Sequence, residues 1–450
     1  MTKAGLSTVP SMHSFKDGRP VTKTLDDFEE IIMADFEFVA APGERPDVVC
    51  LAWHEASSGR THCLWRDQLG DAPPYRIDDK TLFVCFVGNA ELGCHLALNW
   101  PSPKHVLDLN PTFRCIANGR TVPQGRGLLG AMTYYGLDAI DAKMKDDIRK
   151  RVMKGWPFTA DEREKILRYG ASDADAMVRL LPKMLHEINL DIALHWGEFV
   201  SAQAQMEHRG VPIDGEIYQQ LADKRVWSFV RDAMVSEIDA EYGVYTQDAG
   251  GEWHFSMEQF QAYLDRQDID WPLTEKGKLS TKRKTFEDMS KGHPQLENLR
   301  QLRHARDKMR KIKLTVGADN RNRTVLWPFK SKSSRTQPKA SQWIFSPAIW
   351  LRSLIKPEPG QAVAYVDYSS MEFMVGASLS RDPVMIEFYR GGDPCLTFAK
   401  RVGAAPRAAT KHTHGPLRDR YKTGLLAVQY GVQEKTLAGA LARPRSKHTR

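Results

Sequence analysis

The spacing of apolar residues changes partway along the chain, and this change constrains the fold more than any other feature of the sequence. Between residues 26 and 120, short runs rich in β-branched and aromatic residues alternate with turn clusters such as Ala41-Pro42-Gly43. The predicted strands are residues 31–38, 47–53 and 81–87. From about residue 137 to 187 the apolar residues recur with helical spacing. This order predicts an α/β domain over residues 26–190, after a polar segment at residues 1–25.

The chain after this domain is predicted to be mainly helical. Residues 190–242 contain few helix breakers apart from Gly210-Val211-Pro212, which indicates a turn between two helices. Residues 296–314 form an amphipathic pattern with a basic stripe, which is either a phosphate-binding face or an ordinary solvated surface. The stripe consists of Arg303, Arg306, Arg310 and Lys313. A polar, basic loop at 320–340 follows, and residues 362–367 are predicted to form a buried strand that ends on a carboxylate.

Charge is distributed unevenly along the 450 residues. The formal net charge is +8, but residues 301–340 alone carry +10 and residues 401–450 carry +9, which leaves −11 for the rest. Because the affinity for phosphates depends on the local density of Lys and Arg, the second half is expected to hold a phosphate-rich partner. The acidic first half keeps carboxylates for another purpose, such as binding metal ions.

Composition excludes several other classes of protein. The six cysteines form no C-x-x-C pair, so neither a zinc site nor a disulfide framework is expected. No apolar run approaches the roughly 20 residues that cross a bilayer, and the first thirty residues lack a hydrophobic signal segment. We therefore expect a cytoplasmic protein that has no membrane partner.

Four acids and a tyrosine of the first half are candidates for one catalytic site. Asp35 and Glu37 lie at i and i+2 in a predicted strand, so both side chains leave the same face. Glu91 follows another strand and a turn, and Tyr169 and Asp173 share one face of a helix. Each acid alone is also consistent with a solvent-facing surface, and Tyr169 with packing.

This pattern of D-x-E, E and Y-x-x-x-D resembles the DEDDy 3′-to-5′ exonucleases, the proofreading type found in family A DNA polymerases. The resemblance implies a ribonuclease H-like mixed sheet and two Mg²⁺ or Mn²⁺ ions per active site. Several hard oxygen ligands must converge for such two-metal hydrolysis of a phosphodiester. The implied metal ligands are Asp35, Glu37, Glu91 and Asp173, and Tyr169 would orient the attacking water. The substrate would be a single-stranded 3′ end.

Glu91 is the one departure, since the family usually has Asp at that place. The spacing of Asn89-Ala90-Glu91 fits the ligand position, and Asp108 fits a further aspartate that the family often has downstream. If Glu91 is not the ligand, Asp108 is the next candidate.

Two segments near the carboxyl end resemble polymerase motifs A and B of the same family. Residues 366–373, Val-Asp-Tyr-Ser-Ser-Met-Glu-Phe, resemble motif A, whose common form is D-Y-S-Q-I-E-L. The resemblance implies that Asp367 coordinates both metal ions and that Glu372 excludes a ribose 2′-hydroxyl. A strand-terminal aspartate suits phosphoryl transfer.

The second of these segments places four residues at intervals of four after Pro416, a residue typical of a helix start. They are Arg418, Lys422, Leu426 and Tyr430. This spacing resembles motif B, R-x-x-x-K-x-x-x-F-x-x-x-Y-G, which implies that the two cations hold the triphosphate of the incoming nucleotide. Leu426 departs from the aromatic residue of the motif, so that contact would be apolar rather than stacked.

The region between the two halves resembles the thumb of the family. Residues 208–214 resemble the segment that enters the thumb, and residues 333–338 resemble the T-G-R-x-x-x-x-P loop, which places Arg335 at the primer duplex. The basic stripe of 296–314 then becomes a thumb surface against phosphates. The implied architecture is an exonuclease domain at 26–190, a helical connector and thumb at 191–345, and a partial α+β palm and fingers at 346–450.

The third family motif, usually H-D-E, does not occur in the sequence, and residues 443–450 are basic and unpatterned. We therefore expect a chain truncated before its last catalytic aspartate. Three functions remain open: a proofreading DNA polymerase that uses primer-template DNA and deoxynucleoside triphosphates, a truncated polymerase that retains only the exonuclease, and a non-catalytic DNA-binding remnant. A separate RNA-trimming exonuclease would leave motifs A and B without a purpose. A monomer in the cytoplasm of a bacterium or a phage-infected cell is expected.

Overall fold

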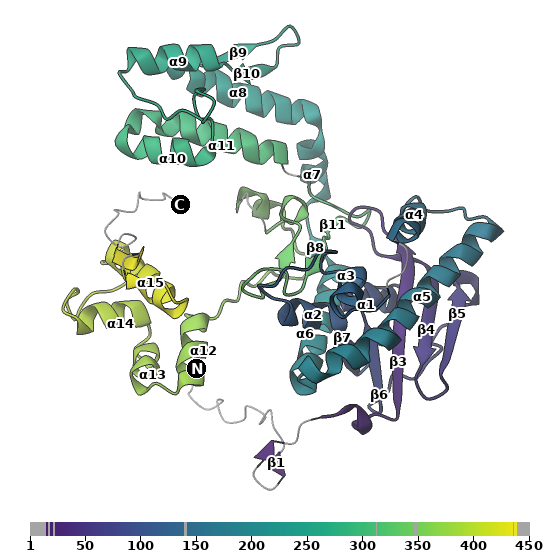
Figure 1. Cartoon of the computed structure of the whole chain (residues 1–450). Coiled ribbons are helices and arrows are strands. Elements are labelled where there is room, and N and C mark those ends of the chain that lie inside the picture. The colour runs from purple at the N-terminus through teal and green to yellow at the C-terminus, as the bar shows by residue number, and fades with distance from the viewer. Residues whose placement is uncertain are drawn as a thin grey trace. The chain divides into compact units, whose positions relative to one another are not determined.

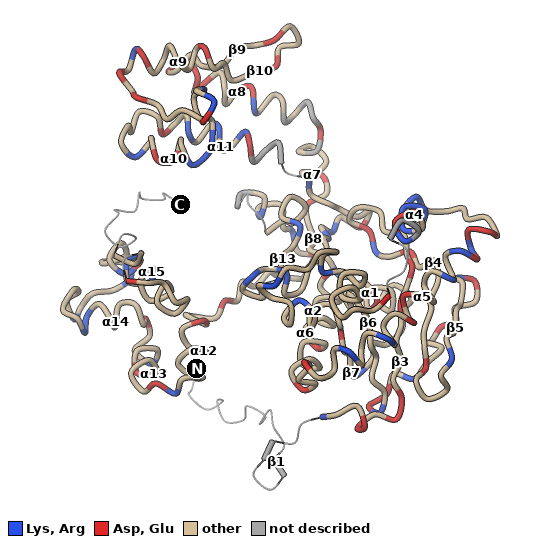
Figure 2. Tube along the Cα trace, viewed as in Figure 1, with Lys and Arg blue, Asp and Glu red and all other residues tan. Residues whose placement is uncertain are grey.

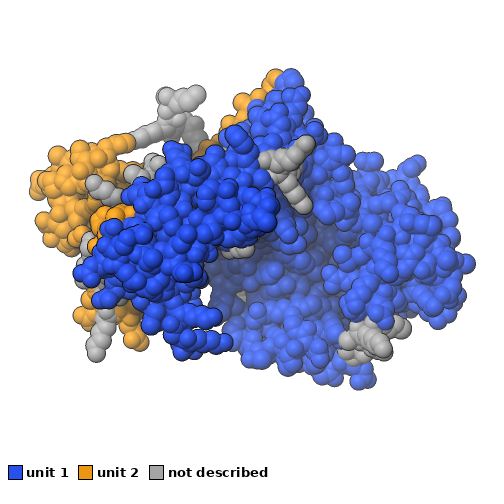
Figure 3. Space-filling view, turned by 90° about the horizontal axis from the view of Figure 1, so that it is seen from above, with its two compact units in different colours: residues 1–283, 297–359 blue, residues 284–296, 360–450 orange. Residues whose placement is uncertain are grey.

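The computed structural model describes residues 15–16, 19–20, 23–138, 142–311, 313–345, 349–434 and 436–438. The chain divides into two compact units, coloured separately in Figure 3. The first comprises residues 1–283 and 297–359, and the second comprises 284–296 and 360–450. Most of the predicted polar segment 1–25 and all of residues 443–450 lie outside the described residues.

A five-stranded mixed sheet forms the core of the first unit (Figure 1). Its strands are β3 (Glu30–Val39), β4 (Asp47–Glu55), β5 (Arg60–Trp65), β6 (Thr81–Cys85) and β7 (His105–Asp108). The order across the sheet is β5-β4-β3-β6-β7. The first three strands pair antiparallel, whereas β3 pairs parallel with β6 and β6 with β7. β3 is therefore the central strand, and both of its faces are covered.

Helices pack against both faces of this sheet, and one hydrophobic cluster lies on each face. The helices are α1 (Gly88–Ala97), α2 (Leu109–Ile116), α3 (Leu128–Tyr134), α4 (Ala142–Met153), α5 (Ala160–Met184) and α6 (Leu190–Arg209). Met33 and its neighbours on one face pack with α5, while Ile32 and Phe36 on the other pack with residues of α1 and α6. The alternation along β3 thus assigns odd-numbered residues, including Asp35 and Glu37, to the face that α5 covers.

The amino end of α5 is fixed by a capping box. The backbone N–H of Glu162 donates to Thr159 Oγ1 at 3.3 Å, and the backbone N–H of Thr159 donates to Glu162 Oε2 at 2.8 Å. Two otherwise unpaired donors are thereby satisfied, which sets the helix start. Because the start is fixed, the positions of Tyr169 and Asp173 further along the helix are fixed as well.

Helix α6 approaches the sheet unusually closely at Gly197. A Cβ atom placed on Gly197 would lie 1.9 Å from the carbonyl oxygen of Val106 in β7. Only glycine allows this contact, since no rotamer change can move a Cβ atom. The close approach lets Val200 and Ala204 of α6 enter the core beneath the sheet.

The remainder of the first unit is mainly helical, with short strand pairs. Its elements are β8 (Val211–Pro212), α7 (Gly215–Ala222), α8 (Lys224–Tyr242), β9 (Tyr245–Gln247), β10 (Trp253–Phe255), α9 (Met257–Arg266), α11 (Glu297–Lys311), β11 (Arg321–Asn322), β12 (Leu326–Trp327) and β13 (Gln337–Pro338). The predicted turn at Gly210-Val211-Pro212 is confirmed, and its strand β8 pairs with β11. A short hairpin of β1 (Phe15–Lys16) and β2 (Arg19–Pro20) lies near the amino end.

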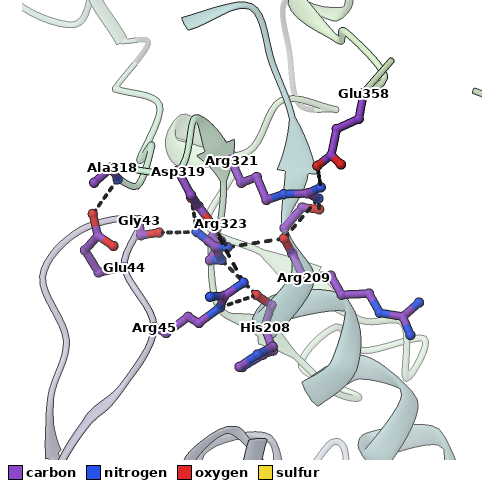
Figure 4. Close-up of polar contacts among 11 residues, drawn as sticks. Gly43, Glu44, Arg45, His208, Arg209, Ala318, Asp319, Arg321, Arg323 and Glu358 are labelled. Atoms are coloured by element: carbon purple, nitrogen blue, oxygen red, sulfur yellow. Dashed lines mark hydrogen bonds and ion pairs between the residues drawn. The ribbon is translucent and has the colours of Figure 1, made fainter. Parts of the chain in front are cut away.

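The guanidinium of Arg323 joins three stretches of chain that are distant in sequence (Figure 4). Its nitrogens donate to the carbonyl oxygens of Gly43 at 3.1 Å, His208 at 3.0 Å and Arg209 at 3.3 Å. Its side chain is only 6% exposed and pairs with Asp319. A buried guanidinium is stable only when its donors are satisfied, as they are here. The β3–β4 loop, the end of α6 and the segment before β11 are therefore held together.

A second link, through Glu207, joins α6 to the start of β12. Glu207 Oε1 accepts hydrogen bonds from the backbone N–H of Leu326 at 2.5 Å and from Asn89 Nδ2 at 2.9 Å. Burial raises the pKa of Glu207 to about 7. Its ionised form is therefore less stable in the folded chain than in the unfolded one.

This shift predicts a pH effect on stability. The pKa of Glu207 in the folded chain lies above its value of about 4.3 in the unfolded chain. The contribution of Glu207 to the free energy of unfolding is therefore complete below about pH 4.3 and is lost as the pH rises through 7. Glu207→Gln removes this titrating group. Between pH 4 and pH 8, the free energy of unfolding of the variant should therefore rise by about 3 kcal/mol relative to that of the wild type. Urea unfolding at several pH values measures this difference. Glu198→Gln, at an exposed position of the same helix, should follow the wild type, and a parallel pH profile for Glu207→Gln would contradict the prediction.

The second unit consists of helices in its described residues, namely α10 (Arg283–Gly292), α12 (Met371–Ser380), α13 (Pro383–Arg390), α14 (Pro394–Arg401) and α15 (Gly415–Gln429). The prediction of a buried strand at 362–367 is wrong. That segment is irregular, and Tyr365 and Val366 are about 85% exposed. Among the described residues of this unit there is no strand to pair with it, so its backbone groups are left to water.

The other predicted elements of the first unit are confirmed: three strands as β3, β4 and β6, and the amphipathic helix as α11. Within the described ranges, no helix combines the length and the apolar character needed to cross a membrane.

Candidate functional site

The acids predicted from the sequence come together beside the central strand. Asp35 and Glu37 project from β3 toward α5, where Tyr169 and Asp173 lie one turn apart. Glu91 comes from the first turn of α1, directly after β6. Glu91 and Asp173 are almost fully buried, and Asp35 and Glu37 are partly buried. Residues up to 138 positions apart in the sequence thus form a single acidic cluster.

Electrostatic repulsion within this cluster is strong. Burial raises the pKa of Asp35 well above its usual range, and the charges of Glu91 and Asp173 add to this effect. Burial also raises the pKa of Glu37 to about 8, with Asp173 as the next contributor. In addition, Asp35 Oδ2 is buried and has no hydrogen-bond partner among the described residues. Such a group is stabilised by a cation.

The structure distinguishes the two candidates for the third acid. The carboxylate of Asp108 already accepts three hydrogen bonds. Their donors are the backbone N–H groups of Val87, Gly88 and Asn110, at 3.0, 2.6 and 2.9 Å. Glu91 instead accepts one bond at 2.8 Å, from the backbone N–H of Phe36, and its charge acts directly on Asp35. The geometry therefore favours Glu91 over Asp108 as a member of the cluster.

Tyr169 is held as a hydrogen-bond donor at the edge of the cluster. Burial raises the pKa of its hydroxyl far above the usual range, and the negative charge of Asp173 raises it further. The hydroxyl therefore stays protonated beside Asp173. The neighbouring Gly170 lets α5 approach the sheet, since a Cβ atom there would lie 3.3 Å from the Cβ of Ala52 and 3.9 Å from Asp35 Oδ2.

One cation of the cluster was not found from the sequence. Lys145 of α4 donates from Nζ to both carboxylate oxygens of Asp173, at 2.9 and 2.8 Å. The same nitrogen lies 5.4 Å from the ring centroid of Tyr169. Lys145 is 28 residues away from Asp173 on a separate helix, so no spacing rule relates the two. Only the packing of α4 on β3 and α5 reveals the contact.

The donor set fits Mg²⁺ or Mn²⁺ in its chemistry. Carboxylate oxygens are the ligands that both ions prefer, and the unpartnered oxygen of Asp35 is available. In the described parts of the chain, however, no three acidic, imidazole or thiol side chains lie close enough together to hold an ion as they stand. Asp173, one of the four acids, is engaged by Lys145 instead.

The basic stripe of α11 is partly engaged by aromatic rings (Figure 2 shows the charges along this helix). The guanidinium carbon of Arg303 lies 4.1 Å from the ring centroid of Phe255, and that of Arg306 lies 4.7 Å from Tyr245. Arg306 also donates to the carbonyl oxygen of Trp253 at 2.7 Å. The side chain of Arg310 lies outside the described residues, while Lys313 and Arg335 are exposed.

The candidate residues of the second unit lie on or beside its helices. Asp367 is in the exposed irregular segment, and Glu372 is in the first turn of α12, where its backbone carbonyl oxygen accepts from Gln429 at 2.6 Å. Arg418 of α15 donates to Asp393 Oδ2 at 2.5 Å. On the same helix are Lys422 and Leu426, and Tyr430 is its C-cap residue. The structure brings Arg418 to α14, not to Asp367.

Comparison with known proteins identifies relatives of the chain. Over 302 residues it is 25% identical to DNA polymerase I of Aquifex aeolicus (strain VF5), covering 60% of this chain and 49% of the relative. Over 276 residues it is 22% identical to the DNA polymerase of Mycobacterium phage D29, covering 56% and 42%. The chain is thus similar in sequence to DNA polymerases over more than half of its length.

A solved structure agrees in fold with this chain. The polymerase domain of Pol1 from M. smegmatis, in complex with a DNA primer-template and dNTP, matches with a TM-score of 0.61 at 18% identity, over 92% of this chain and 69% of that one. No protein-family model matches the chain. The chain spans about half the length of the curated DNA polymerases that it matches.

Proposed function

We propose that the chain is a DNA polymerase-type enzyme whose α/β domain removes nucleotides from 3′ ends of DNA. One observation carries the proposal: four carboxylates and a tyrosine, dispersed in the sequence, converge between β3, α1 and α5. Burial raises the pKa of Asp35 and Glu37, and repulsion from neighbouring carboxylates raises it further. Divalent cations would relieve that repulsion. The mixed sheet order is in keeping with a ribonuclease H-like exonuclease domain.

Each group of the cluster has a role in this hydrolysis. Asp35, Glu37, Glu91 and Asp173 would hold two Mg²⁺ or Mn²⁺ ions, which when bound stabilise the attacking hydroxide and the leaving 3′ oxygen. The hydroxyl of Tyr169 stays protonated and orients the attacking water. The hydrogen bond from the N–H of Phe36 fixes the Glu91 carboxylate.

Template-directed nucleotide transfer is the second candidate function. It rests on the homology to DNA polymerases and on the fold match to a polymerase domain. In this function Asp367 binds the metal ions, Glu372 excludes ribonucleotides and Arg418 and Lys422 hold the triphosphate. Leu426 and Tyr430 would contact the nascent pair. For this role Arg418 would exchange Asp393 for phosphate, since its guanidinium now pairs with that carboxylate.

DNA contacts and location complete the proposal. Arg303, Arg306, Arg310, Lys313 and Arg335 are the residues proposed to contact the phosphates of primer-template DNA. Of these, the exposed Lys313 and Arg335 are the better placed, because Arg303 and Arg306 lie over aromatic rings. A monomer in the cytoplasm of a bacterium or of a phage-infected cell remains the proposed setting.

A gel assay at single-nucleotide resolution separates the two functions. With a 5′-labelled primer-template and Mg²⁺, we expect the wild type to shorten the primer and Asp35→Ala to leave it intact. With nucleotides added, extension that is lost in Asp367→Ala would establish synthesis. Shortening that persists in Asp35→Ala would contradict the proposed nuclease site, and extension that persists in Asp367→Ala would contradict the second function.

A further inference from the structure

Lys145 is bound to the two carboxylate oxygens of Asp173 that a metal ion would need. Its ammonium engages both oxygens of that carboxylate at 2.9 and 2.8 Å. The contact is partly buried, with side-chain exposures of 23% for Lys145 and 7% for Asp173. Charge-assisted hydrogen bonds of this kind are strong. A metal ion can therefore bind Asp173 only by breaking this pair.

We propose that Lys145 is the cation that a divalent metal displaces from Asp173, and that its freed ammonium then contacts the phosphodiester to be cleaved. This inference rests on the proposed nuclease function and adds to it a residue outside the carboxylate set. Among the described residues, Lys145 is the one that donates to both oxygens of Asp173.

Charge balance supports the second step. Four carboxylates neutralise two divalent ions, so a bound phosphodiester would leave one uncompensated negative charge. One ammonium group neutralises this charge. Because negative charge develops in the transition state, the ammonium stabilises the transition state more than the bound substrate. The lysine side chain can turn from Asp173 toward the phosphodiester, because its ammonium group is carried on a flexible four-carbon chain.

The surroundings of Lys145 favour its staying near the site after displacement. The negative charges of Asp35 and Glu37 act on it from β3, the ring of Tyr169 lies beside it, and Arg149, one turn further along α4, also acts on Glu37. Helix α4 thus presents two cations to the acidic cluster, and of these Lys145 is the one hydrogen-bonded to Asp173.

Two measurements on the full chain test the proposal. Binding of Mn²⁺, followed by electron paramagnetic resonance without DNA, should be about tenfold tighter in Lys145→Met, because the ion no longer competes with an ammonium. Single-turnover cleavage of a 3′-terminal phosphodiester at saturating Mn²⁺ should be about a hundredfold slower in the same variant. Lys145→Arg should restore much of the cleavage rate, since it keeps the positive charge.

Lys150→Met is the matched control. Lys150 lies on the same helix but is 64% exposed and pairs only with Asp146 in the contacts of the structure, so both readouts should equal those of the wild type. Mn²⁺ binding in Lys145→Met that is no tighter than in the wild type would overturn the displacement, and an unchanged cleavage rate at saturating metal would overturn the phosphate contact. If the wild type binds Mn²⁺ at this cluster but cleaves no DNA, the proposed function fails, while the affinity comparison still decides the displacement.

Discussion

Replacing Asp35 with Asn will abolish the removal of 3′ nucleotides and at the same time make the metal-free protein more stable. Asp35 is partly buried among acids, and its Oδ2 atom is buried without a hydrogen-bond partner among the described residues. Asn removes the charge at constant size, which relieves repulsion and desolvation together by about 1 kcal/mol. The same change removes a proposed metal ligand, so the cleavage rate should fall by roughly a thousandfold or more.

A second buried aspartate of the same domain provides the contrast. Asp108 accepts three backbone hydrogen bonds, so Asp108→Asn should lower the stability, in the opposite direction to Asp35→Asn. Thermal unfolding without metal and single-turnover cleavage with Mg²⁺ measure the two effects. If Asp35→Asn were less stable than the wild type, the account of an electrostatically strained cluster would be wrong. Retained cleavage would remove Asp35 from the site.

Gly197→Ala is expected to have the largest effect on stability. The added Cβ would lie 1.9 Å from the carbonyl oxygen of Val106, a backbone atom held within the sheet. Helix α6 must therefore move away, and Val200 and Ala204 would lose their contacts in the core. We expect a loss of about 3 kcal/mol or more in the free energy of unfolding.

Gly93→Ala on the neighbouring helix α1 is the control for this substitution. A Cβ atom at Gly93 would meet only Pro46, at an ordinary 3.7 Å. Because alanine favours helix more than glycine does, this variant should be as stable as the wild type or more stable by up to about 1 kcal/mol. Urea unfolding of both variants tests the pair. Equal stability of Gly197→Ala and Gly93→Ala would contradict the packing of α6 described above.

Local patterns in the sequence were sufficient to predict three strands of the central sheet, β3, β4 and β6, and the shared faces of four cluster residues. The alternation along β3 places Asp35 and Glu37 on one face, and helical spacing places Tyr169 and Asp173 on one face of α5. The structure brings these faces together with Glu91. Each of these pairs of residues lies within a single strand or helix, so the spacing in the sequence was enough to predict that the two side chains share a face.

Relations between distant elements could not be predicted in the same way. The pairing of Lys145 with Asp173 depends on how α4 packs, and the rings of Phe255 and Tyr245 that engage the arginines of α11 come from a separate strand pair. The error at 362–367 has a similar origin. An apolar run indicates a strand only if a second strand supplies hydrogen bonds, and partner strands are not encoded in the run itself.

The contacts of Arg323 also determine where this protein can bend. A change of angle between α6 and the segment that follows it would have to break the bonds to Gly43, His208 and Arg209 simultaneously, together with the pair to Asp319. The short connection around Gly210 is therefore rigid and does not act as a hinge, although a glycine in a turn is often a site of mobility. Any large rearrangement of this unit must take place elsewhere along the polypeptide.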